Sequence, residues 1–469
     1  MVHVTGSQDG GLEQSDTLGW QHALLLARQD MCARNERIVL QYTSLRAEMT
    51  HNFTDSEMNP HTISTASTRI LWYRRMFIAE RCLISFAMGI FALLPVYLLS
   101  IGRDEIFFGS ISAAGMATAI LIVLISPSLT RQFSVRRLAP VGGLLYAAGC
   151  ATILVNEFSG VRATLPYFLS YMLQSGGWAL HFTVGSICIA ALSSDADRSS
   201  SFMAYSAFST LGVTCGPLLS SLLTRFTGLG TLDMFILAML AATAASALSS
   251  WAAQRAANIR DADIPNHASL ARELFTLLFS NSAMFFVLVL LSASIYTTLI
   301  NFQAPFANNS GLRYEIFFGS WAIAVVGSRF AIGPRVSRGA ADRILPLLLG
   351  GMVISLLGFH YSPGHPVIYA VGSLATGITY GLSYPLMQAE AVRVTAPQSR
   401  TLVQIIFSLS YFLGLYFFPF AAGIVSVHLG YDTLTLLIAG LALLQTAIAL
   451  VGYRTTRRKP VSTVASNKG

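Results

Sequence analysis

Long apolar runs separated by short polar stretches account for most of the chain between about residues 77 and 453. A lipid core about 30 Å thick requires about 20 consecutive apolar residues for a helix to cross it. Because lipid offers no partner to open backbone groups, such spans are helical. Twelve runs are long enough: 77–100, 107–126, 138–157, 165–192, 201–224, 233–252, 276–302, 316–334, 344–361, 366–389, 402–426 and 433–453. The pattern predicts an all-α integral membrane protein with twelve transmembrane helices.

The chain also repeats itself at a fixed distance. The hexapeptide at 105–110, EIFFGS, returns letter for letter at 315–320, an offset of 210 residues. The same offset joins Pro95 to Pro305, Ser100 to Ser310 and Arg103 to Arg313. An offset of 202 joins Arg198, Gly212 and Pro217 to Arg400, Gly414 and Pro419. Fixed-offset similarity within a membrane chain indicates structural repeats, so we predict two similar halves of six helices each.

Composition agrees with a membrane location and accounts for the net charge. Hydrophobic residues make up 54% of the chain and charged residues 11%, against about 25% charged residues in soluble proteins. Arginine gathers on one side of the predicted membrane, and the other side holds only Arg103, Arg162, Arg225 and Arg313. The positive-inside rule therefore places both termini in the cytoplasm. We assign the net charge of +8 to a surface facing anionic lipid, not to a nucleic-acid partner.

The apolar pattern divides the chain into five predicted segments. Residues 1–70 form a polar cytoplasmic extension, disordered or partly helical, without a signal peptide. Residues 71–252 and 276–455 are the two six-helix halves, a cytoplasmic linker covers 253–275, and residues 456–469 are a cytoplasmic tail. The five cysteines lack the spacing of a metal site. The positive charge is almost all arginine, which suggests a GC-rich genome and a bacterial inner membrane.

A basic loop between the second and third runs carries the first resemblance to a known family. The stretch 127–137, PSLTRQFSVRR, is similar to the loop motif Gly-x-x-x-Asp-(Arg/Lys)-x-Gly-Arg-(Arg/Lys) of the major facilitator superfamily. Its basic end is present, whereas the glycines and the aspartate are replaced; the counterpart from Gly333 to Arg343 is also incomplete. The resemblance covers about residues 70–455 and implies a secondary transporter. The residues expected to act in gating are Arg131, Arg136, Arg137, Arg329, Asp342 and Arg343.

The fifth run resembles a motif of the exporters in that family, Gly-x-x-x-Gly-Pro-x-x-Gly-Gly. The chain reads GVTCGPLLSS from Gly212 to Ser221, with Gly216 and Pro217 in the expected places. The glycines are expected to let this helix approach its neighbours closely, and the proline to bend it. The stretch 377–388 also resembles the tenth helix of bacterial efflux-type members, so the resemblance favours export.

In this fold the substrate site is expected near the midplane between the halves, lined by the first, fourth, seventh and tenth helices. In the fourth run Gln174, Trp178 and His181 are spaced i, i+4 and i+7, so they share one face. An ionisable residue at membrane depth suggests a functional site, and histidine changes charge between about pH 5 and 8. His181 is therefore the candidate for proton coupling. The alternative is a neutral imidazole hydrogen-bonded to another helix.

Polar and aromatic residues of the seventh and tenth runs complete the expected substrate cavity. The candidates are Tyr296, Asn301, Tyr380, Tyr384 and Gln388, residue types suited to a medium-sized organic substrate. Helix packing is the alternative role for these tyrosines. Arg329 is expected to act as a gate, or else to meet an anionic substrate, Glu390 or a backbone carbonyl. Glu80 and Arg81 are expected in the first turn of the first helix, and no Asp or Glu is expected deep in the bundle.

Three functions are compatible with these observations. The first is proton-driven export of a drug, siderophore or metabolite. The second is uptake of a nutrient or siderophore on the same scaffold. The third is a membrane sensor or assembly factor that keeps the fold and transports nothing. The chain carries no nucleotide-binding loop, metal cluster or nucleophile–base pairing, so no enzyme, cofactor or metal is expected, and a monomer is expected to suffice.

Overall fold

The computed structural model describes residues 60–192, 198–255, 276–280, 282–336, 341–395 and 399–458. The chain divides into two compact units, Met1–Thr68 and Arg69–Gly469. Nearly all of the first unit lies outside the described residues, as do most of the predicted linker and the end of the tail. The expectations for those segments stay predictions.

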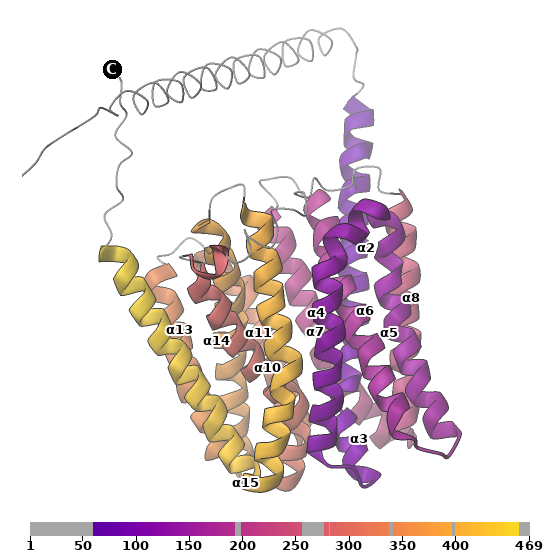
Figure 1. The fold of residues 1–469 in the computed structure, drawn as a ribbon, viewed down its shortest axis with the longest axis vertical. Helices are drawn as coiled ribbons and strands as arrows, with labels where there is room; N and C mark the ends of the chain where they lie inside the picture. The colour runs from indigo at the N-terminus through magenta and orange to yellow at the C-terminus, as the bar shows by residue number, and fades with distance from the viewer. Residues whose placement is uncertain are drawn as a thin grey trace, which may run out of the picture. The chain divides into compact units, whose positions relative to one another are not determined.

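The second unit is built from helices (Figure 1). Its first half contains α2 (Pro60–Phe91, which begins in the first unit), α3 (Leu94–Ser100), α4 (Glu105–Gln132), α5 (Val135–Phe158), α6 (Thr164–Ala191), α7 (Arg198–Thr227) and α8 (Thr231–Arg255). Its second half contains α10 (Ala283–Asn309), α11 (Tyr314–Ala331), α12 (Gly333–Val336), α13 (Ala341–His360), α14 (Pro366–Arg393) and α15 (Arg400–Arg458). Each of the twelve predicted runs falls largely on one of these helices.

The longest helix, α15, accounts for two predicted runs. Its 59 residues are interrupted at Gly430, where φ is 82° and ψ is 169°. Glycine adopts positive φ without a steric penalty, so the chain turns here between the eleventh and twelfth spans. By length and apolar composition eight candidate membrane spans occur in the described part of the chain, and the one at Leu402–Arg454 covers both of these runs. Helices α6, α11 and α14 are not among the eight, although α6 and α14 have 28 residues each.

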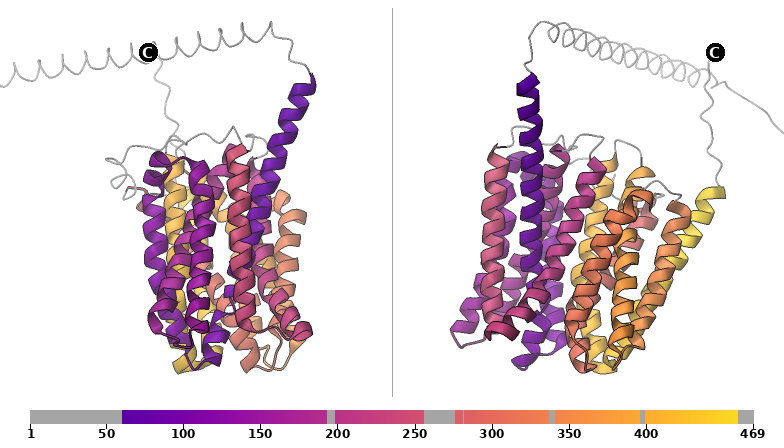
Figure 2. Two further views of the ribbon diagram at one scale, coloured as in Figure 1. Left: turned by 90° about the vertical axis from the view of Figure 1, so that its right-hand side faces the viewer. Right: turned by 180° about the vertical axis from the view of Figure 1, so that it is seen from behind.

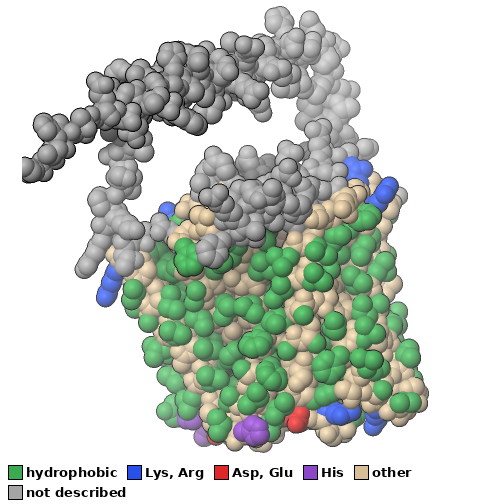
Figure 3. Space-filling model, viewed as in Figure 1, with side chains coloured by type: hydrophobic (Ala, Val, Ile, Leu, Met, Phe, Trp, Pro, Cys, Tyr) green, Lys and Arg blue, Asp and Glu red, His purple; other side chains and the backbone are tan. Residues whose placement is uncertain are grey.

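The surface matches a bilayer environment. On the face drawn in Figure 3, hydrophobic side chains cover the sides of the bundle, while the visible basic, acidic and histidine side chains lie at its two ends. Large apolar side chains such as Val155, Leu165 and Leu347 are more than two-thirds exposed. Helical serines and threonines satisfy their hydroxyls within the helix; Ser175, for example, donates to the carbonyl of Tyr171. The protein is an all-helical membrane protein.

The first helix differs from the sequence prediction in a way that matters for function. We expected it to begin at residue 77, but α2 begins at Pro60 and the candidate membrane span is Leu71–Ser100. Glu80 therefore lies nine residues inside that span, about 14 Å along the helix axis. Glu80 is 1% exposed and Arg81 3% exposed. The placement of this pair in a first turn is wrong, because the apolar stretch continues on both sides of it.

The expectation of no Asp or Glu deep in the bundle is wrong because of Glu80. Two further carboxylates, Glu157 and Glu390, are each 6% exposed but lie near the ends of α5 and α14. Each of these two has an arginine beside it in sequence and in space: Arg162 Nε lies 3.1 Å from a Glu157 oxygen, and Arg393 Nη2 lies 2.6 Å from a Glu390 oxygen. A buried carboxylate is retained when it is paired and hydrogen-bonded, and composition alone does not reveal that pairing.

The two halves meet mainly where α4 packs on α15 and α7 on α11, with a smaller contact of α3 with α10; Figure 2 shows the halves from two further sides. The repeated hexapeptide lies at the start of α4 and of α11, the second helix of each half. The glutamate that begins each copy accepts a hydrogen bond from the opposite half. Glu105 accepts from Tyr431, and Glu315 accepts from Ser221. These two bonds lie at the end of the bundle where α3 and the Gly430 break are found, which we call the distal end (Figure 1).

Close helix packing within the first half depends on glycines of the fifth-run motif. A Cβ on Gly212 would overlap the Cys82 carbonyl oxygen and lie 2.8 Å from Ser85 Cβ, and one on Gly216 would lie 2.5 Å from the Gly89 carbonyl carbon. Helix α7 thus touches α2 through its backbone, as the small residues suggest. Pro217 lies inside α7.

Candidate functional site

An acid–base pair lies inside the first half. His181 Nδ1 of α6 is 3.0 Å from Glu80 Oε1 of α2, and the two side chains are 2% and 1% exposed. The contact has the distance of an ion pair, but neither Glu80 oxygen has a hydrogen-bond partner, nor does His181 Nε2. Helix α6 is held at this place by a close approach to α5, since a Cβ on Gly142 would lie 2.8 Å from His181 Cβ.

Arg81, the next residue of α2, lies among aromatic rings. Its guanidinium carbon is 4.3 Å from the centre of the Trp178 ring and 5.1 Å from the centres of the Phe182 and Tyr205 rings. Arg81 Nε donates to Ser209 Oγ of α7 at 3.0 Å, whereas Nη1 is buried with no hydrogen-bond partner. A desolvated cation over aromatic faces is stabilised by about 2 kcal/mol, which helps explain how a charge is retained here.

A second buried arginine approaches from the other half. Arg329 of α11 is 5% exposed, donates from Nε to the Gly381 carbonyl of α14 at 2.9 Å, and donates from Nη1 to Thr210 Oγ1 of α7 at 3.0 Å. Ser209 and Thr210 are consecutive residues, so the arginines of the two halves bind neighbouring hydroxyls of one helix. Of the alternatives raised for Arg329, the structure shows the hydrogen bond to a backbone carbonyl. Arg329 also binds a residue of the other half.

Aromatic rings connect the two arginines. Tyr296 of α10 stacks on Tyr380 of α14 at 5.2 Å and 13°, and Tyr380 stacks on Tyr384 at 6.2 Å and 21°. Tyr384 meets Tyr411 of α15 at 5.5 Å. Tyr411 in turn stacks across the halves on Phe182 at 6.2 Å and 14°, beside Arg81. Both arginines interact electrostatically with Tyr296 and with Tyr384. Ten residues form what we call the central cluster: Glu80, Arg81, Trp178, His181, Phe182, Tyr296, Arg329, Tyr380, Tyr384 and Tyr411.

A small cavity lies next to the central cluster on its distal side. It measures about 30 Å³ and is lined by Gln174, Asn301, Tyr171, Tyr416 and other residues of α2, α5, α6, α10 and α15. Gln174 donates to Ser170 Oγ at 2.9 Å, and Asn301 donates to the carbonyl and hydroxyl of Thr297. A space of this size holds about two water molecules. An organic substrate would therefore enter this region only when the halves move apart.

The structure sorts the predicted substrate residues into three places. Trp178, His181, Tyr296, Tyr380 and Tyr384 come together in the central cluster, and Gln174 with Asn301 lines the adjacent cavity. Gln388 is separate, because it donates to Gln404 of α15 at 2.9 Å within the second half. The cluster also contains Phe182 and Tyr411, which the sequence did not single out, and Glu80 and Arg81, which it had assigned to the first turn of the first helix.

The predicted gating residues other than Arg329 lie at the end opposite the distal end, where α4 ends and α5 and α13 begin. Arg137 and Arg343 are exposed, and Arg136 and Asp342 are half-buried. Asp342 interacts electrostatically with Arg393. The side chain of Arg131 is not among those described.

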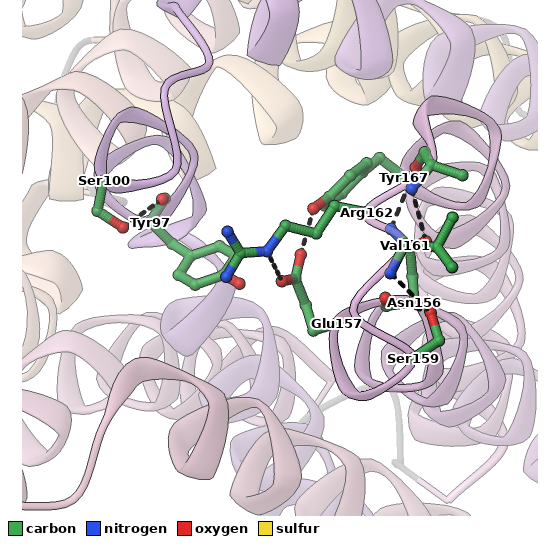
Figure 4. A network of polar contacts seen from close by, with 9 residues as sticks. Tyr97, Ser100, Asn156, Glu157, Ser159, Val161, Arg162 and Tyr167 are labelled. Carbon is green, nitrogen blue, oxygen red and sulfur yellow. Dashed lines mark hydrogen bonds and ion pairs between the residues drawn. The ribbon is translucent and has the colours of Figure 1, made fainter.

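A separate polar network lies at the distal end of the first half (Figure 4). Glu157 of α5 contacts Arg162 and accepts a hydrogen bond from Tyr167, while Asn156 bonds the Ala163 backbone in both directions. Arg162 has φ of 48°, an uncommon value for a residue other than glycine. This network closes the loop between α5 and α6. A second cavity, of about 380 Å³, lies at the distal end between α3, α7, α8 and α11 and is lined by Arg225, Arg313 and Glu315 among others.

Within the described ranges no group of three His, Cys, Asp or Glu side chains is placed to hold a metal ion. The arrangement that the central cluster offers is instead one for binding: two buried arginines and an aromatic surface at the contact between the two halves, beside an acid–base pair inside the first half.

Sequence and fold comparisons point to one family. The profile described as Major Facilitator Superfamily matches residues 76–365 and 339–469. No curated protein sequence matches the chain. Among solved structures, the human organic anion transporter MFSD10 (TETRAN) is similar with a TM-score of 0.59 and 16% identity, over 82% of this chain and 99% of that one.

Two further crystal structures have a similar fold. A mutant of the nucleoside transporter NupG gives a TM-score of 0.63 and 14% identity, over 81% of this chain and 99% of that one. A mutant of the E. coli fucose:proton symporter FucP gives 0.59 and 14%, over 83% and 100% of the two chains. At these identities the likeness concerns the fold alone.

Proposed function

The chain belongs to the major facilitator superfamily and is a secondary transporter of small molecules, and we propose that it couples the export of a small organic molecule to protons. The observation that carries the proposal is the contact of 3.0 Å between Glu80 and His181 in the interior of the first half. Ionisable residues inside transmembrane helices are expensive to keep, and proton relays are a frequent reason for keeping them.

Proton coupling requires a group that changes its charge. This group must lie where the charge can influence both the binding of the substrate and the contact between the two halves. Glu80 Oε1 and His181 Nδ1 are close enough to share a proton. The free Nε2 of His181 and the free Oε2 of Glu80 are the atoms available to accept a further proton. That proton adds one positive charge beside Arg81, which binds Ser209 of α7.

The groups that face the pair come from three helices. Arg81 lies next to Glu80 on α2, Cys188 of α6 interacts electrostatically with Glu80, and Tyr205 of α7 interacts with both Glu80 and Arg81. A change of charge on the pair therefore changes the electrostatic interactions of α7, the helix that also binds Arg329 of the second half. This is the route by which we propose that protonation changes the contact between the halves.

The distal contacts between the halves supply the gate in this proposal. Besides the bonds to Glu105 and Glu315, Ser112 of α4 donates to the Tyr416 carbonyl of α15 at 2.9 Å. The Phe108 and Phe302 rings meet there as well, at 6.0 Å. Substrate passage at the distal end would break these contacts, and the loop residues Arg131, Arg136, Arg137, Asp342 and Arg343 would act at the opposite end.

The direction of transport is proposed from the sequence around Gly212, Gly216 and Pro217, which resembles that of exporters. We place the protein, as a monomer, in a bacterial inner membrane with both termini in the cytoplasm. Uptake is the second candidate, and the two buried arginines favour it. Protonation of the pair raises the positive charge beside Arg81, so a negatively charged molecule would bind together with the proton and not in exchange for it.

An untargeted metabolite comparison tests the proposal and its direction. Bacterial cells producing the protein are compared with cells producing His181→Ala or Trp178→Ala, at equal membrane abundance, and His428→Ala serves as control because His428 is exposed. A compound that accumulates in the medium with the unmodified protein and with the control, but not with the other two variants, supports export. Depletion of a compound from the medium would indicate uptake. The same metabolite profile in all strains would contradict transport through this site and favour the sensor or assembly role.

A further inference from the structure

We propose that the substrate is an organic anion with a flat aromatic or conjugated part, bound through Arg81 and Arg329 and stacked along Tyr296, Tyr380 and Tyr384. The inference deepens the proposed function and rests on it, in whichever direction transport runs. It follows from the charges, the free donors and the ring geometry of the central cluster.

The charges of the cluster are unbalanced. Arg329 is buried, and the acceptors it binds are the neutral Gly381 carbonyl and Thr210 hydroxyl. Arg81 binds the neutral Ser209 hydroxyl. Among the described residues the acidic group next to this site is Glu80, which is already in contact with His181. Two fixed cations thus face at most one carboxylate, and protonation of that carboxylate leaves both unbalanced. Since an uncompensated buried charge is costly, a negative ligand is the partner that stabilises the site.

Unused hydrogen-bond donors point to a ligand as well. Arg81 Nη1 and Trp178 Nε1 are buried without a hydrogen bond, and the further polar group that faces Arg81 is the neutral Tyr205 hydroxyl. Buried donors without partners are rare in native proteins and call for an explanation. An anion near Arg81 would accept from its Nη1 and is the ligand type for which arginine forms its strongest hydrogen bonds. The same donors would repel an ammonium group.

The aromatic surface defines the rest of the ligand. The rings of Tyr296, Tyr380 and Tyr384 are nearly parallel to their neighbours in the stack, with interplanar angles of 13° and 21°. Arg329 binds the carbonyl of Gly381, the residue after Tyr380. Arg81 lies over the Phe182 ring, which stacks on Tyr411, the neighbour of Tyr384. A planar group that enters when the halves separate would find flat aromatic faces with both cations nearby. A flexible aliphatic or fully hydroxylated molecule would fit the aromatic faces and the cations less well.

Binding to three matched probes tests the inference. The probes are 2-naphthoate, 2-naphthamide and 2-naphthylmethylammonium, which share the ring system and differ in charge. Calorimetry on the purified full-length protein in lipid nanodiscs is expected to give at least about tenfold tighter binding of the naphthoate than of the amide, as for a hydrogen bond to a charged group. The ammonium is expected to bind most weakly. Equal or tighter binding of the amide or the ammonium, or no binding of any probe, overturns the inference.

Variants assign the anion to the proposed arginines. Arg329→Gln and Arg81→Gln are each expected to weaken naphthoate binding at least about tenfold and to leave the amide nearly unchanged, and Arg329→Lys is expected to retain a preference for the anion. Arg393→Gln is the control, since Arg393 pairs with Glu390 at the end of α14. An equal loss in Arg393→Gln overturns the inference. If an Arg→Gln variant unfolds, the charge series on the unmodified protein still decides.

The same probes separate this inference from the proposed function. In proteoliposomes loaded with a pH-sensitive dye, proton movement that depends on the ammonium probe but not on the naphthoate leaves proton-coupled transport standing and overturns the anion inference. Conversely, naphthoate that binds through the arginines and crosses the membrane without moving protons supports the anion inference and contradicts the coupling.

Discussion

His181 Nδ1 lies 3.0 Å from Glu80 Oε1 between two helices of the first half, and neither side chain is more than 2% exposed. The pair lies beside Arg81, whose guanidinium covers the Trp178 ring and binds α7. A proton gained or lost by the pair changes the charge next to Arg81. Arg81 contacts α7, and α7 also contacts Arg329 of the second half. The predictions below test the elements of this arrangement.

Glu80 and His181 are expected to be energetically coupled. In a double-mutant cycle of Glu80→Gln and His181→Gln, we expect a coupling free energy of about 1 kcal/mol or more, the range seen for residues in direct contact. The measurement is the free energy of unfolding in mixed micelles for the two single variants and the double variant. A cycle of Glu390→Gln with His181→Gln serves as control, and equal coupling in both cycles would contradict a specific pair.

The distal glutamates are expected to hold the two halves together. Glu105→Gln and Glu315→Gln weaken bonds to Tyr431 and Ser221 that cross the halves, so the double variant should open the distal end more often. Ser112→Cys in a background without other cysteines reports this opening through its reaction with a membrane-impermeant maleimide, because Ser112 is 0% exposed.

The expected result is several-fold faster labelling of Ser112→Cys when both glutamates are changed. Asp233→Asn is the matched control, because Asp233 accepts from the Gly230 amide within one half. Unchanged labelling in the glutamate variant, or equally faster labelling in the control, would show that these bonds do not hold the distal end closed.

The glycines between α7 and α2 are expected to be sensitive to size. Gly212→Leu places a side chain against the Cys82 carbonyl and Ser85, and overpacking of this kind costs about 1–3 kcal/mol. Gly440→Leu, where a Cβ meets no atom within 4 Å, should leave stability unchanged. Thermal unfolding in detergent compares the two. A similar midpoint for both variants would show that α7 and α2 are not held by this close packing.

The cation–ring contact is expected to depend on the presence of an aromatic face. Trp178→Phe keeps a ring beneath Arg81, whereas Trp178→Ala removes it and should cost about 2 kcal/mol, against about 0.5–1 kcal/mol for an exposed contact of this kind. Trp251→Ala provides the comparison, because the Trp251 ring meets the Trp72 ring edge to face and not a cation. The readout is naphthoate affinity together with unfolding. If Trp178→Phe behaves like Trp178→Ala, the contact with Arg81 does not depend on the ring.

Much of the helix layout could be predicted from the apolar runs, because lipid requires long helices and the chain satisfies that need nearly everywhere. The tyrosines of α10 and α14 and the pair Trp178 and His181 were also within reach, since helical spacing determines which residues share a face. The fixed-offset repeat correctly indicated equivalent places, because both copies lie at the start of the second helix in their half.

The sequence failed where burial depends on partners from distant helices. Glu80 and Arg81 were taken for the start of a helix because charged residues usually mark a membrane boundary, and nothing in the local sequence reveals that His181 and Ser209 lie opposite them. Tyr411 and Phe182 were missed because their importance comes from a contact between halves. Gln388 was assigned to the cavity because of its position on a stripe, yet one turn beyond Tyr384 the helix already faces Gln404.

Infrared difference spectroscopy tests the central claim, proton binding at Glu80 and His181, most directly and without a known substrate. Spectra of the protein in lipid are recorded as the pH is raised through the range in which histidines ordinarily change charge, about pH 5 to 8. We predict a carboxyl C=O band or a histidine ring band that changes in the unmodified protein and in Glu390→Gln but is absent when Glu80→Gln and His181→Gln are combined. The same spectral change in that double variant would show that the proton binds elsewhere and would contradict the account.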